Sequence, residues 1–427
     1  MLHMAKRQAV FLLLIALIAP VLAACGGGAT TSSPTAAAPA AQATTAPAPT
    51  TAPEATAPPA ATTAAAATTA PEATSAPEAT AATGGGATGN FKPRDVTAKL
   101  TGSGASFPDP IYQSWVKNYK TVAPTVEINY QSVGSGQGRK DFFGGVTDFG
   151  GTDKFASDSE LAGAITGTLK SEVLHIPTVL GAVVATYNVP GVDKLQFSGE
   201  TLAGIFMGTI TNWNDPKIAA DNPGVTLPDL EITVAHRSDG SGTTSIFTNY
   251  LSSVSPDWKS KVGAGDTVQW PTGQGGEKNP GVAAIVQQTE GGIGYVELIY
   301  ALSNKLPVPA VKNAAGKYVV PSLESTAAAA AGFLAKTPDD LRVNIVNPPE
   351  GETSYPIAGY TWILVAKEQK DEAKAQALTD FLYWALTQGS EAAKSLNYAP
   401  LPDEIRTKAI AKLGQIMVNG KPAFTAP

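Results

Sequence analysis

The sequence predicts an α/β protein of two lobes that follows a disordered tether. The chain has 427 residues, and a chain of that length is expected to divide into domains of roughly 100–200 residues. From about Val96, strand-like segments alternate with helix-like ones, which is the pattern of an α/β fold. Near-continuous apolar runs at residues 178–188 and 360–366 are typical of strands buried on both faces, as in parallel sheets covered by helices.

Several elements of the globular part can be placed from residue spacing. A short strand covers residues 99–100, and a second strand covers residues 126–130. Between them, apolar residues at helical spacing over residues 111–119 predict a helix after Pro108. Near the C-terminus, residues 373–386 form a helix with one apolar face.

We expect the two lobes to be discontinuous in sequence. The apolar runs at residues 178–188 and 360–366 stand where two strands would have to cross between lobes. Residues 96–176 together with 355–427 would then form the first lobe, and residues 177–354 the second.

The first 25 residues have the features of an export leader. Lys6 and Arg7 precede an uncharged stretch over residues 9–24, and residues 22–25 (LAAC) resemble a lipobox. The stretch is shorter than the roughly 20 residues that span a bilayer, which disfavours the alternative of a transmembrane anchor. We therefore predict cleavage before Cys25 and lipidation of that residue, which would hold the protein on a membrane by two acyl chains.

The segment after Cys25 cannot form a core. Residues 26–90 are almost wholly Ala, Thr, Pro, Ser and Gly, and only Glu54, Glu72 and Glu78 are charged. Without large apolar side chains the segment buries too little surface to offset the entropy of ordering. We predict a disordered linker over residues 26–95 that lets the globular part reach beyond the membrane surface.

Composition excludes several classes of function. Thirty Lys and Arg against 36 Asp and Glu give a net charge of -6, so a nucleic-acid partner is not expected. An anionic ligand would have to be held by local donors instead of by the field of the whole protein. The single cysteine permits no internal disulfide, and the three histidines have no metal-ligand spacing.

Three Gly-Ser-Gly triplets carry the first chemical signal, at residues 102–104, 134–136 and 240–242. Each lies between a strand-like segment and a probable helix. Glycine lets the backbone turn tightly and leaves the N–H groups of the following helix start free to bind an anion. A single triplet is more typical of an ordinary turn. Nearby hydroxyls would add donors, and these belong to Ser106, Ser135, Ser241 and Thr243.

Two charged positions extend this pattern. Arg237 could pair two oxygens of a tetrahedral anion through its planar fork, with Asp239 orienting the guanidinium; a surface Arg–Asp pair is the alternative. Asp153 is unusual beside an anion unless the anion itself carries a proton, as phosphate does near neutral pH and sulfate does not. Its alternative role is to cap a helix that begins near Ala156.

Four segments stand in chain order at residues 101–108 (TGSGASFP), 129–136 (NYQSVGSG), 148–153 (DFGGTD) and 237–243 (RSDGSGT). Together they resemble one known family, the phosphate-binding (PstS-type) lipoproteins of phosphate ABC transporters. Further similar blocks are residues 213–216 (WNDP), 270–273 (WPTG) and 294–297 (GYVE). The resemblance covers roughly residues 100–401, and the ordered set is specific where each segment alone is not.

The resemblance implies a two-lobed periplasmic-binding-protein fold of type II with a hinge between the lobes. It also implies capture of inorganic phosphate outside the cytoplasm and its delivery to ABC permease subunits, by a monomer without a cofactor. Threonine is also common where Ser106 stands, and residues 136–138 depart from the usual run after Ser135. By motif position the phosphate ligands would be Ser106, the backbone N–H of Phe107, Ser135, Asp153, Arg237, Ser241, Gly242 and Thr243, with Asp239 paired to Arg237.

Three alternatives to this function differ in class. Another tetrahedral oxyanion could be the ligand. A secreted hydrolase or phosphatase fits less well, because no serine completes Gly-x-Ser-x-Gly, only His175 and His236 could serve as a base, and residues 134–140 miss the phosphate-loop spacing. A surface adhesin would leave the arginine, aspartate and hydroxyl set unexplained.

Overall fold

The computed structural model describes residues 91–427. The predicted leader, the lipidation site at Cys25 and residues 26–90 of the predicted linker lie outside the described residues. From residue 91 onward, no helix combines the length and the apolar character needed to cross a bilayer.

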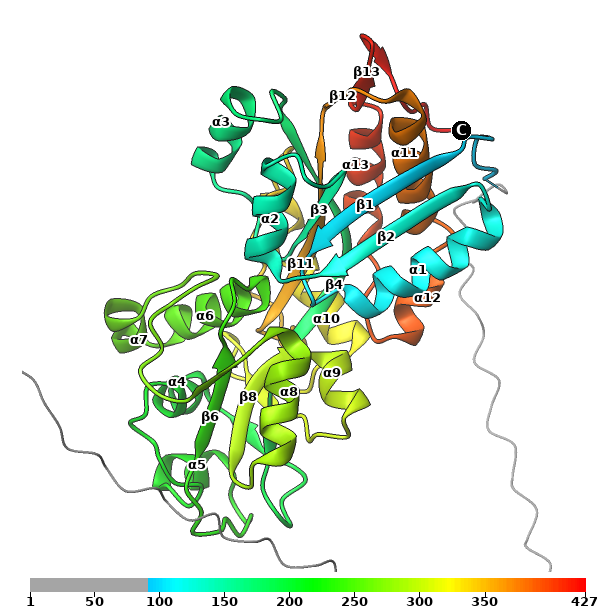
Figure 1. Ribbon diagram of the computed structural model, residues 1–427. Coiled ribbons are helices and arrows are strands. Elements are labelled where there is room, and N and C mark those ends of the chain that lie inside the picture. Colours follow the sequence, from blue (N-terminus) through cyan, green and yellow to red (C-terminus); the bar gives the residue numbers. More distant parts are fainter. Residues whose placement is uncertain (1–90) are drawn as a thin grey trace, which may run out of the picture. The chain divides into compact units, whose positions relative to one another are not determined.

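One mixed sheet of eight strands organises the fold, in the order β2-β1-β3-β11-β4-β8-β6-β7. In Figure 1, β1, β2 and β3 lie in one half of the ribbon, β6 and β8 lie in the other, and β4 and β11 lie between them. The strands of this sheet are β1 (Ala98–Gly104), β2 (Val126–Ser132), β3 (Phe149–Thr152), β4 (Val173–Asn188), β6 (Thr233–Arg237), β7 (Gln274–Gly276), β8 (Gly292–Glu297) and β11 (Ala358–Ala366).

Helices cover this sheet, and two small sheets complete the described part of the chain. The helices are α1 (Asp109–Val122), α2 (Ser135–Phe143), α3 (Asp158–Thr166), α4 (Gly199–Phe206), α5 (Pro216–Asp221), α6 (Gly242–Val254), α7 (Pro256–Lys261), α8 (Lys278–Gln288), α9 (Leu298–Ser303), α10 (Leu323–Ala331), α11 (Glu372–Leu386), α12 (Ser390–Ser395) and α13 (Asp403–Leu413). The small sheets have the orders β10-β9-β5 and β12-β13-β14. Their strands are β5 (Gln196–Phe197), β9 (Ala310–Lys312), β10 (Tyr318–Val319), β12 (Glu368–Gln369), β13 (Met417–Val418) and β14 (Lys421–Pro422).

The elements predicted from spacing are confirmed at α1, β2 and α11. Helix α1 begins with a proline in its first turn and buries Ile111, Trp115 and Tyr119, which recur every four residues on one face. Helix α11 is capped by Asp371, the residue before its first turn, whose side chain accepts a hydrogen bond from the Lys374 N–H. Helix α1 therefore follows from a proline start and one apolar stripe, and α11 from a capping residue and one apolar stripe.

The two long apolar runs form β4 and β11, and both strands are buried on both faces as predicted. The expectation of parallel partners is wrong for them. Residues 173–182 of β4 pair antiparallel with β11, and residues 183–188 pair antiparallel with β8. The chain runs along β4 from one half of the sheet to the other and returns along β11, so the two strands must run in opposite directions. Parallel pairs occur elsewhere, between β1 and its neighbours β2 and β3 and between β6 and its neighbours β7 and β8.

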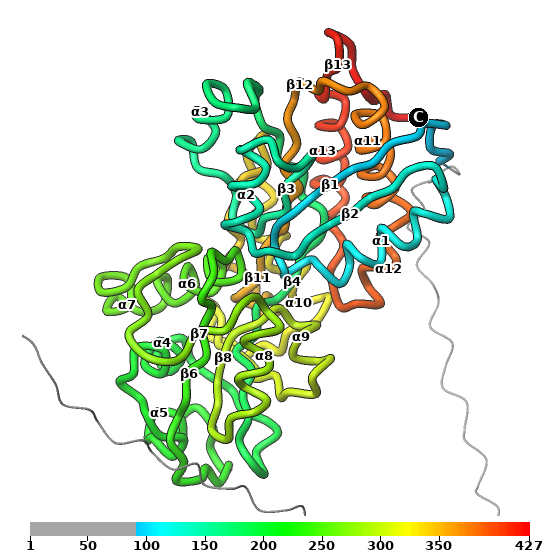
Figure 2. Tube along the Cα trace, in the orientation of Figure 1, coloured from blue at the N-terminus to red at the C-terminus, as the bar shows by residue number. Residues whose placement is uncertain are grey.

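The division into discontinuous lobes stays a prediction. Figure 2 places the blue-to-teal segments from β1 to α3 and the orange-to-red segments from α11 to β13 in one half, and the green-to-yellow segments from α4 to α9 in the other, which is the grouping that the division requires. The expected boundary between residues 176 and 177 falls inside β4, whereas the pairing of β4 changes partner only between Ala182 and Val183. Strand pairing therefore favours a boundary a few residues later.

The predicted linker ends earlier than composition indicates. Residues 91–95, assigned to the linker above, pack against α11. The Arg94 Nη2 atom donates to the Asp380 Oδ1 atom at 2.5 Å, and Asp380 is 2% exposed. The Phe91 ring lies edge-on to the Tyr383 ring with 4.7 Å between centroids. The folded part of the chain therefore begins by Phe91, because these five residues contribute a partly buried ion pair and an aromatic contact.

A protein that begins at residue 91 should be more stable than one that begins at residue 96. The shorter protein leaves the buried Asp380 carboxylate without Arg94, and because Arg94 is itself partly exposed, the loss should cost roughly 1–3 kcal/mol, less than breaking a fully buried pair. Denaturant unfolding of the two proteins measures the difference, and Arg94→Ala in the longer protein should reproduce most of it. Equal unfolding midpoints would show that residues 91–95 belong to the linker after all.

Candidate functional site

The starts of four helices meet at the middle of the described part. The turn before α1 and the first turns of α2, α6 and α8 are joined by hydrogen bonds between segments far apart in sequence. The Gly136 N–H donates to the Gly240 carbonyl at 2.8 Å, and the Asn279 Nδ2 atom donates to the Ser106 Oγ atom at 3.0 Å. The first N–H groups of a helix lack intrahelical partners, and the helix dipole makes that end positive. Four such ends form a region that favours an anion.

The structure brings all the predicted site residues into this region. All of them are buried except Asp239, which is half-buried, although the region carries two carboxylates, a guanidinium and several hydroxyls. They are Ser106 and Phe107 before α1, Ser135 at the start of α2, Asp153 after β3, Arg237 at the end of β6, Asp239 in the following loop, and Ser241, Gly242 and Thr243 at the start of α6.

Two of the three Gly-Ser-Gly triplets allow these helix starts to lie close to one another. A Cβ atom on Gly242 would lie 2.6 Å from the Asp153 Oδ2 atom and 2.7 Å from the Ser135 Oγ atom. A Cβ atom on Gly136 would lie 2.9 Å from the Gly240 Cα atom. Any side chain at these positions would therefore push the two turns apart.

The first triplet has a different role from the predicted one. Residues 102–104 lie inside β1, not in a loop before a helix. A Cβ atom on Gly102 would lie 2.1 Å from the Phe149 Cε2 atom, so the glycine makes room for a buried ring. The Ser103 hydroxyl donates to Asp141 at 2.8 Å.

Two tyrosines hold the turn that carries Ser106 and Phe107. The Tyr398 hydroxyl donates to the Phe107 carbonyl at 2.6 Å, and the Tyr300 hydroxyl donates to the Ser106 carbonyl at 2.5 Å. Burial raises the pKa of Tyr398 well above its usual range, so its hydroxyl stays protonated and remains a donor. These bonds fix the turn before α1 from two sides.

Arg237 is 4% exposed, which rules out the alternative of a surface pair. Its Nε and Nη2 atoms donate to the two carboxylate oxygens of Asp239 at 2.7 Å and 2.5 Å. Asp239 also accepts the Lys278 N–H at 3.0 Å. Burial opposes ionisation of Asp239, but the hydrogen bonds and charge of Arg237 outweigh it, and the pKa of Asp239 is lowered. The guanidinium is thus held in one plane, with its Nη1 atom 3.4 Å from the Thr243 Oγ1 atom.

Asp153 lies among donors and is 4% exposed. Its Oδ1 atom accepts from the Thr361 hydroxyl at 2.8 Å, and its Oδ2 atom lies 3.3 Å from the Ser135 Oγ atom. Burial raises the pKa of Asp153 to about 7, against the opposing effects of the Thr361 bond and the Arg237 charge. A carboxyl with that pKa can share a proton with a ligand near neutral pH.

The alternative role of Asp153 as a helix cap is wrong. The nearest helix, α3, begins at Asp158, and its cap is Ser157. The Ser157 Oγ atom accepts the Glu160 N–H at 3.3 Å, and the Glu160 carboxylate accepts the Ser157 N–H at 2.8 Å, which completes a capping box. Asp153 is therefore free of that structural task.

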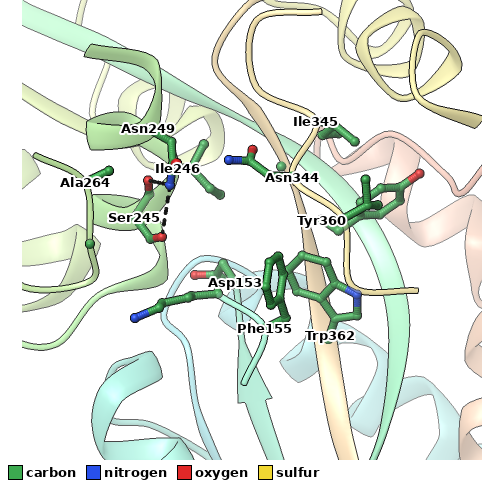
Figure 3. A pocket seen from close by; sticks show the side chains of 14 residues that line it. Asp153, Phe155, Ser245, Ile246, Asn249, Ala264, Asn344, Ile345, Tyr360 and Trp362 are labelled. Atoms are coloured by element: carbon green, nitrogen blue, oxygen red, sulfur yellow. Dashed lines mark hydrogen bonds between the residues drawn. The ribbon is translucent and has the colours of Figure 1, made fainter. Parts of the chain in front are cut away.

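A cavity of about 190 Å³ adjoins the Asp153 side of the site. Figure 3 shows Asp153, Phe155 and Trp362 along one side, with the Phe155 and Trp362 rings next to each other, and Ser245 and Asn249 across from Asp153. Asp153 is the one carboxylate among its lining residues, and the volume is enough for several water molecules. The carboxylate therefore lies between the Gly242 turn and a space that water can occupy.

Ion pairs join segments that carry residues of the site. Asp266 accepts from Arg139 of α2 and from the Lys154 Nζ atom, the latter at 3.0 Å. The Arg139 Nε atom also donates to Glu160 at 2.9 Å. These bonds join the loop after α7 to α2 and to the segment after β3, so they draw the two halves of the site together.

Sequence reasoning missed two polar residues of the site. Thr361 lies within the apolar run of β11, where an isolated hydroxyl was the only available signal. Asn279 is fully buried at the start of α8 and hydrogen-bonds Ser106 and Thr243, but it lies in no motif that we singled out.

The chain is similar to a known domain family and to individual proteins of known name. It matches the family model described as the PBP superfamily domain over residues 40–388. It is 45% identical to the phosphate-binding protein PstS of Xylella fastidiosa over 311 residues, which cover 72% of this chain and 83% of that protein. It is 40% identical to the PstS protein of Methanocaldococcus jannaschii, with 77% and 87% covered.

Solved structures share the fold. A phosphate-binding protein from Stenotrophomonas maltophilia is 22% identical, with a TM-score of 0.58 over 74% of this chain and 93% of that one. A high-affinity periplasmic phosphate-binding protein, PfluDING, solved with bound phosphate, is 21% identical, with a TM-score of 0.60 over 76% and 96%. At these identities the likeness concerns the fold alone.

Proposed function

Because this chain belongs to the PstS family of phosphate-binding proteins, we propose that it captures inorganic phosphate outside the cytoplasm and delivers it to an ABC import permease. The observation that carries the proposal is the placement of two buried groups of opposite charge, Arg237 and Asp153, among four helix starts. Arg237 with the N–H groups and hydroxyls would bind the anion, and Asp153 would accept the proton that phosphate still carries.

The ligand set of this proposal is the one named by motif position. Ser106, the Phe107 N–H, Ser135 and Asp153 would contact phosphate from the first lobe. Arg237, Ser241, Gly242 and Thr243 would contact it from the second, with Asp239 orienting Arg237. The burial of the eight proposed phosphate ligands in one region supports the assignment.

Two lobes that close around the ligand would bring these two sets together. The proposed hinge lies at β4 and β11, the strands that run between the halves of the main sheet. The ion pairs of Asp266 with Arg139 and Lys154 would favour the closed form. We further propose that the protein acts as a monomer.

Calorimetric titration with phosphate, arsenate and sulfate tests the ligand. At about pH 8, where Asp153 is mostly ionised, phosphate should bind and sulfate should not, because sulfate has no proton for that carboxylate. Arsenate, which is also protonated, should bind. Sulfate that binds as tightly as phosphate would overturn the proposal in favour of a general oxyanion site.

A binding role is favoured over hydrolysis by the histidines. His175 is buried, and its Nε2 atom accepts the Ala156 N–H at 3.0 Å. Burial lowers the pKa of His175 to about 3. His236 stacks on Trp270 with 5.0 Å between ring centroids. Incubation with a generic phosphomonoester should therefore release no phosphate above the level given by buffer.

Lipidation of Cys25 is proposed as the membrane anchor. Cys25→Ser removes the thiol that would carry the lipid, so the protein should leave the membrane fraction and appear in the soluble fraction. Ser33→Ala, a change in the linker that spares the cysteine, is the matched control. Membrane retention of the Cys25→Ser protein would contradict the proposed anchor.

A further inference from the structure

Asn279 has all of its side-chain hydrogen-bonding groups engaged. It is fully buried at the start of α8. Its Oδ1 atom accepts the Glu297 N–H at 2.9 Å. A backbone N–H can only donate, so the amide oxygen must face Glu297 and the amide nitrogen must face the site. The two hydrogens of that Nδ2 atom point to the Ser106 Oγ atom at 3.0 Å and the Thr243 Oγ1 atom at 3.2 Å.

These bonds use up the acceptor capacity of two hydroxyls in the site. A hydroxyl has two lone pairs and one hydrogen. The Ser106 Oγ atom accepts from the Asn279 Nδ2 atom and also from the Asn279 backbone N–H, the latter at 3.2 Å. The Thr243 Oγ1 atom accepts from Asn279 and from the Arg237 Nη1 atom at 3.4 Å. Each hydroxyl is left with only its hydrogen to offer.

We propose that Asn279 is a positioning residue that fixes Ser106 and Thr243 as obligate hydrogen-bond donors to the bound anion. This inference rests on the proposed function. Without Asn279, either hydroxyl could rotate and accept a hydrogen bond from a protonated ligand oxygen or from water. With it, the ligand oxygens that face Ser106 and Thr243 can only accept hydrogen bonds from them, so the ligand's proton cannot be donated to either hydroxyl. Asp153 is the carboxylate among the side chains proposed to contact phosphate, so the ligand's proton is directed to it instead of to Ser106 or Thr243.

The same contacts link the donor role of the Ser106 hydroxyl to closure of the site. Ser106 precedes α1, whereas Asn279 and Thr243 lie at the starts of α8 and α6. In the proposed lobe division Ser106 belongs to the first lobe and the other two residues to the second. Ser106 therefore becomes an obligate donor only when the site closes.

A double-mutant cycle measured by phosphate titration tests this role. Asn279→Ala in the parent protein should weaken phosphate binding by about tenfold, because two hydroxyls lose their fixed orientation. In a Ser106→Ala/Thr243→Val protein the same substitution should cost less than about threefold, because the residues through which Asn279 acts are gone. A purely structural Asn279 would cost the same factor in both proteins, and that result would overturn the inference.

A second variant covers the case in which Asn279→Ala does not fold. Asn279→Asp keeps the size of the side chain and the oxygen that accepts the Glu297 N–H, but it has no N–H donors. Its carboxylate oxygen should draw the Ser106 and Thr243 hydrogens away from the ligand, so it should bind phosphate more weakly than the parent by at least about tenfold. Parent-like phosphate affinity in Asn279→Asp would overturn the inference.

Asn222 offers a matched control. It is 4% exposed, and its Nδ2 atom donates to the carbonyls of Gln196 and Ile218, both at 2.9 Å. Asn222→Ala should lower the melting temperature and leave phosphate affinity unchanged.

The outcomes separate this inference from the proposed function. A parent protein that binds no phosphate would overturn both. If the parent binds phosphate but Asn279→Ala causes equal losses in both proteins of the cycle, this inference alone is overturned.

Discussion

Arg237→Ala should weaken phosphate binding by at least about tenfold, and by more than the loss of any one hydroxyl of the site. A charge-assisted hydrogen bond contributes roughly 1.5–3 kcal/mol against about 1 kcal/mol for a neutral one, and Arg237 can give more than one to a tetrahedral anion. The substitution also leaves the Asp239 carboxylate without the partner that lowers its pKa. An unpaired negative charge would then face the ligand.

Calorimetric titration of three variants measures this effect. Arg237→Lys keeps the charge but loses the planar fork, so its phosphate affinity should fall between those of Arg237→Ala and the parent. Arg342→Ala is the matched control, since Arg342 forms its ion pairs with Asp340 and Asp158 outside the proposed site. Parent-like affinity in Arg237→Ala would show that the anion is bound somewhere else.

Asp153→Asn should change the choice of anion. In the parent at about pH 8, sulfate would set its charge against an ionised, buried carboxylate. The amide removes that charge and supplies N–H donors, so sulfate binding should strengthen by at least about tenfold relative to phosphate binding. A tenfold change in affinity is the same free energy as a shift of about one pKa unit.

The pH dependence of sulfate binding shows whether the charge of Asp153 weakens sulfate binding. The pKa of Asp153 is raised to about 7, so the carboxyl is neutral below that pH and can donate its hydrogen to sulfate. Sulfate should therefore bind the parent better at about pH 5.5 than at about pH 8, whereas Asp153→Asn should bind sulfate equally at both. An unchanged ratio of phosphate to sulfate affinity in Asp153→Asn would contradict the proton-accepting role.

Melting curves without ligand provide the control for Asp153→Asn. The folded protein holds the Asp153 proton up to about pH 7, whereas the ordinary pKa is 3.8. Between those values the folded state binds more protons than the unfolded state, so stability falls as pH rises through that window. The substitution removes this loss, and its ligand-free melting temperature at about pH 8 should equal or exceed that of the parent.

The sequence predicted the parts of the site that are encoded locally. A glycine-rich turn before a helix start needs only neighbouring residues, so the turns at Ser135 and Ser241 could be recognised. Arg237 and Asp239 are two residues apart, and their pairing could be anticipated. Asn279 could not, because its role arises from contacts with Ser106, 173 positions away, and with Thr243.

The errors in the fold have a similar origin. Burial of β4 and β11 on both faces followed from composition, but their antiparallel pairing depends on how the chain passes between the halves of the sheet. The end of the linker was misplaced because Arg94 reaches Asp380 across 286 positions of sequence. A single ion pair between distant residues leaves no local pattern.

A crystal structure of the protein with phosphate, grown at about pH 8, tests the central claim most directly, because at that pH Asp153 should be ionised and able to accept the ligand's proton. We predict one phosphate enclosed by the four helix starts, with oxygens in hydrogen-bonding contact with Arg237, Ser106 and Thr243 and one oxygen facing Asp153. Phosphate bound at any other place, or bound here with Asp153 turned away from it, would contradict the account.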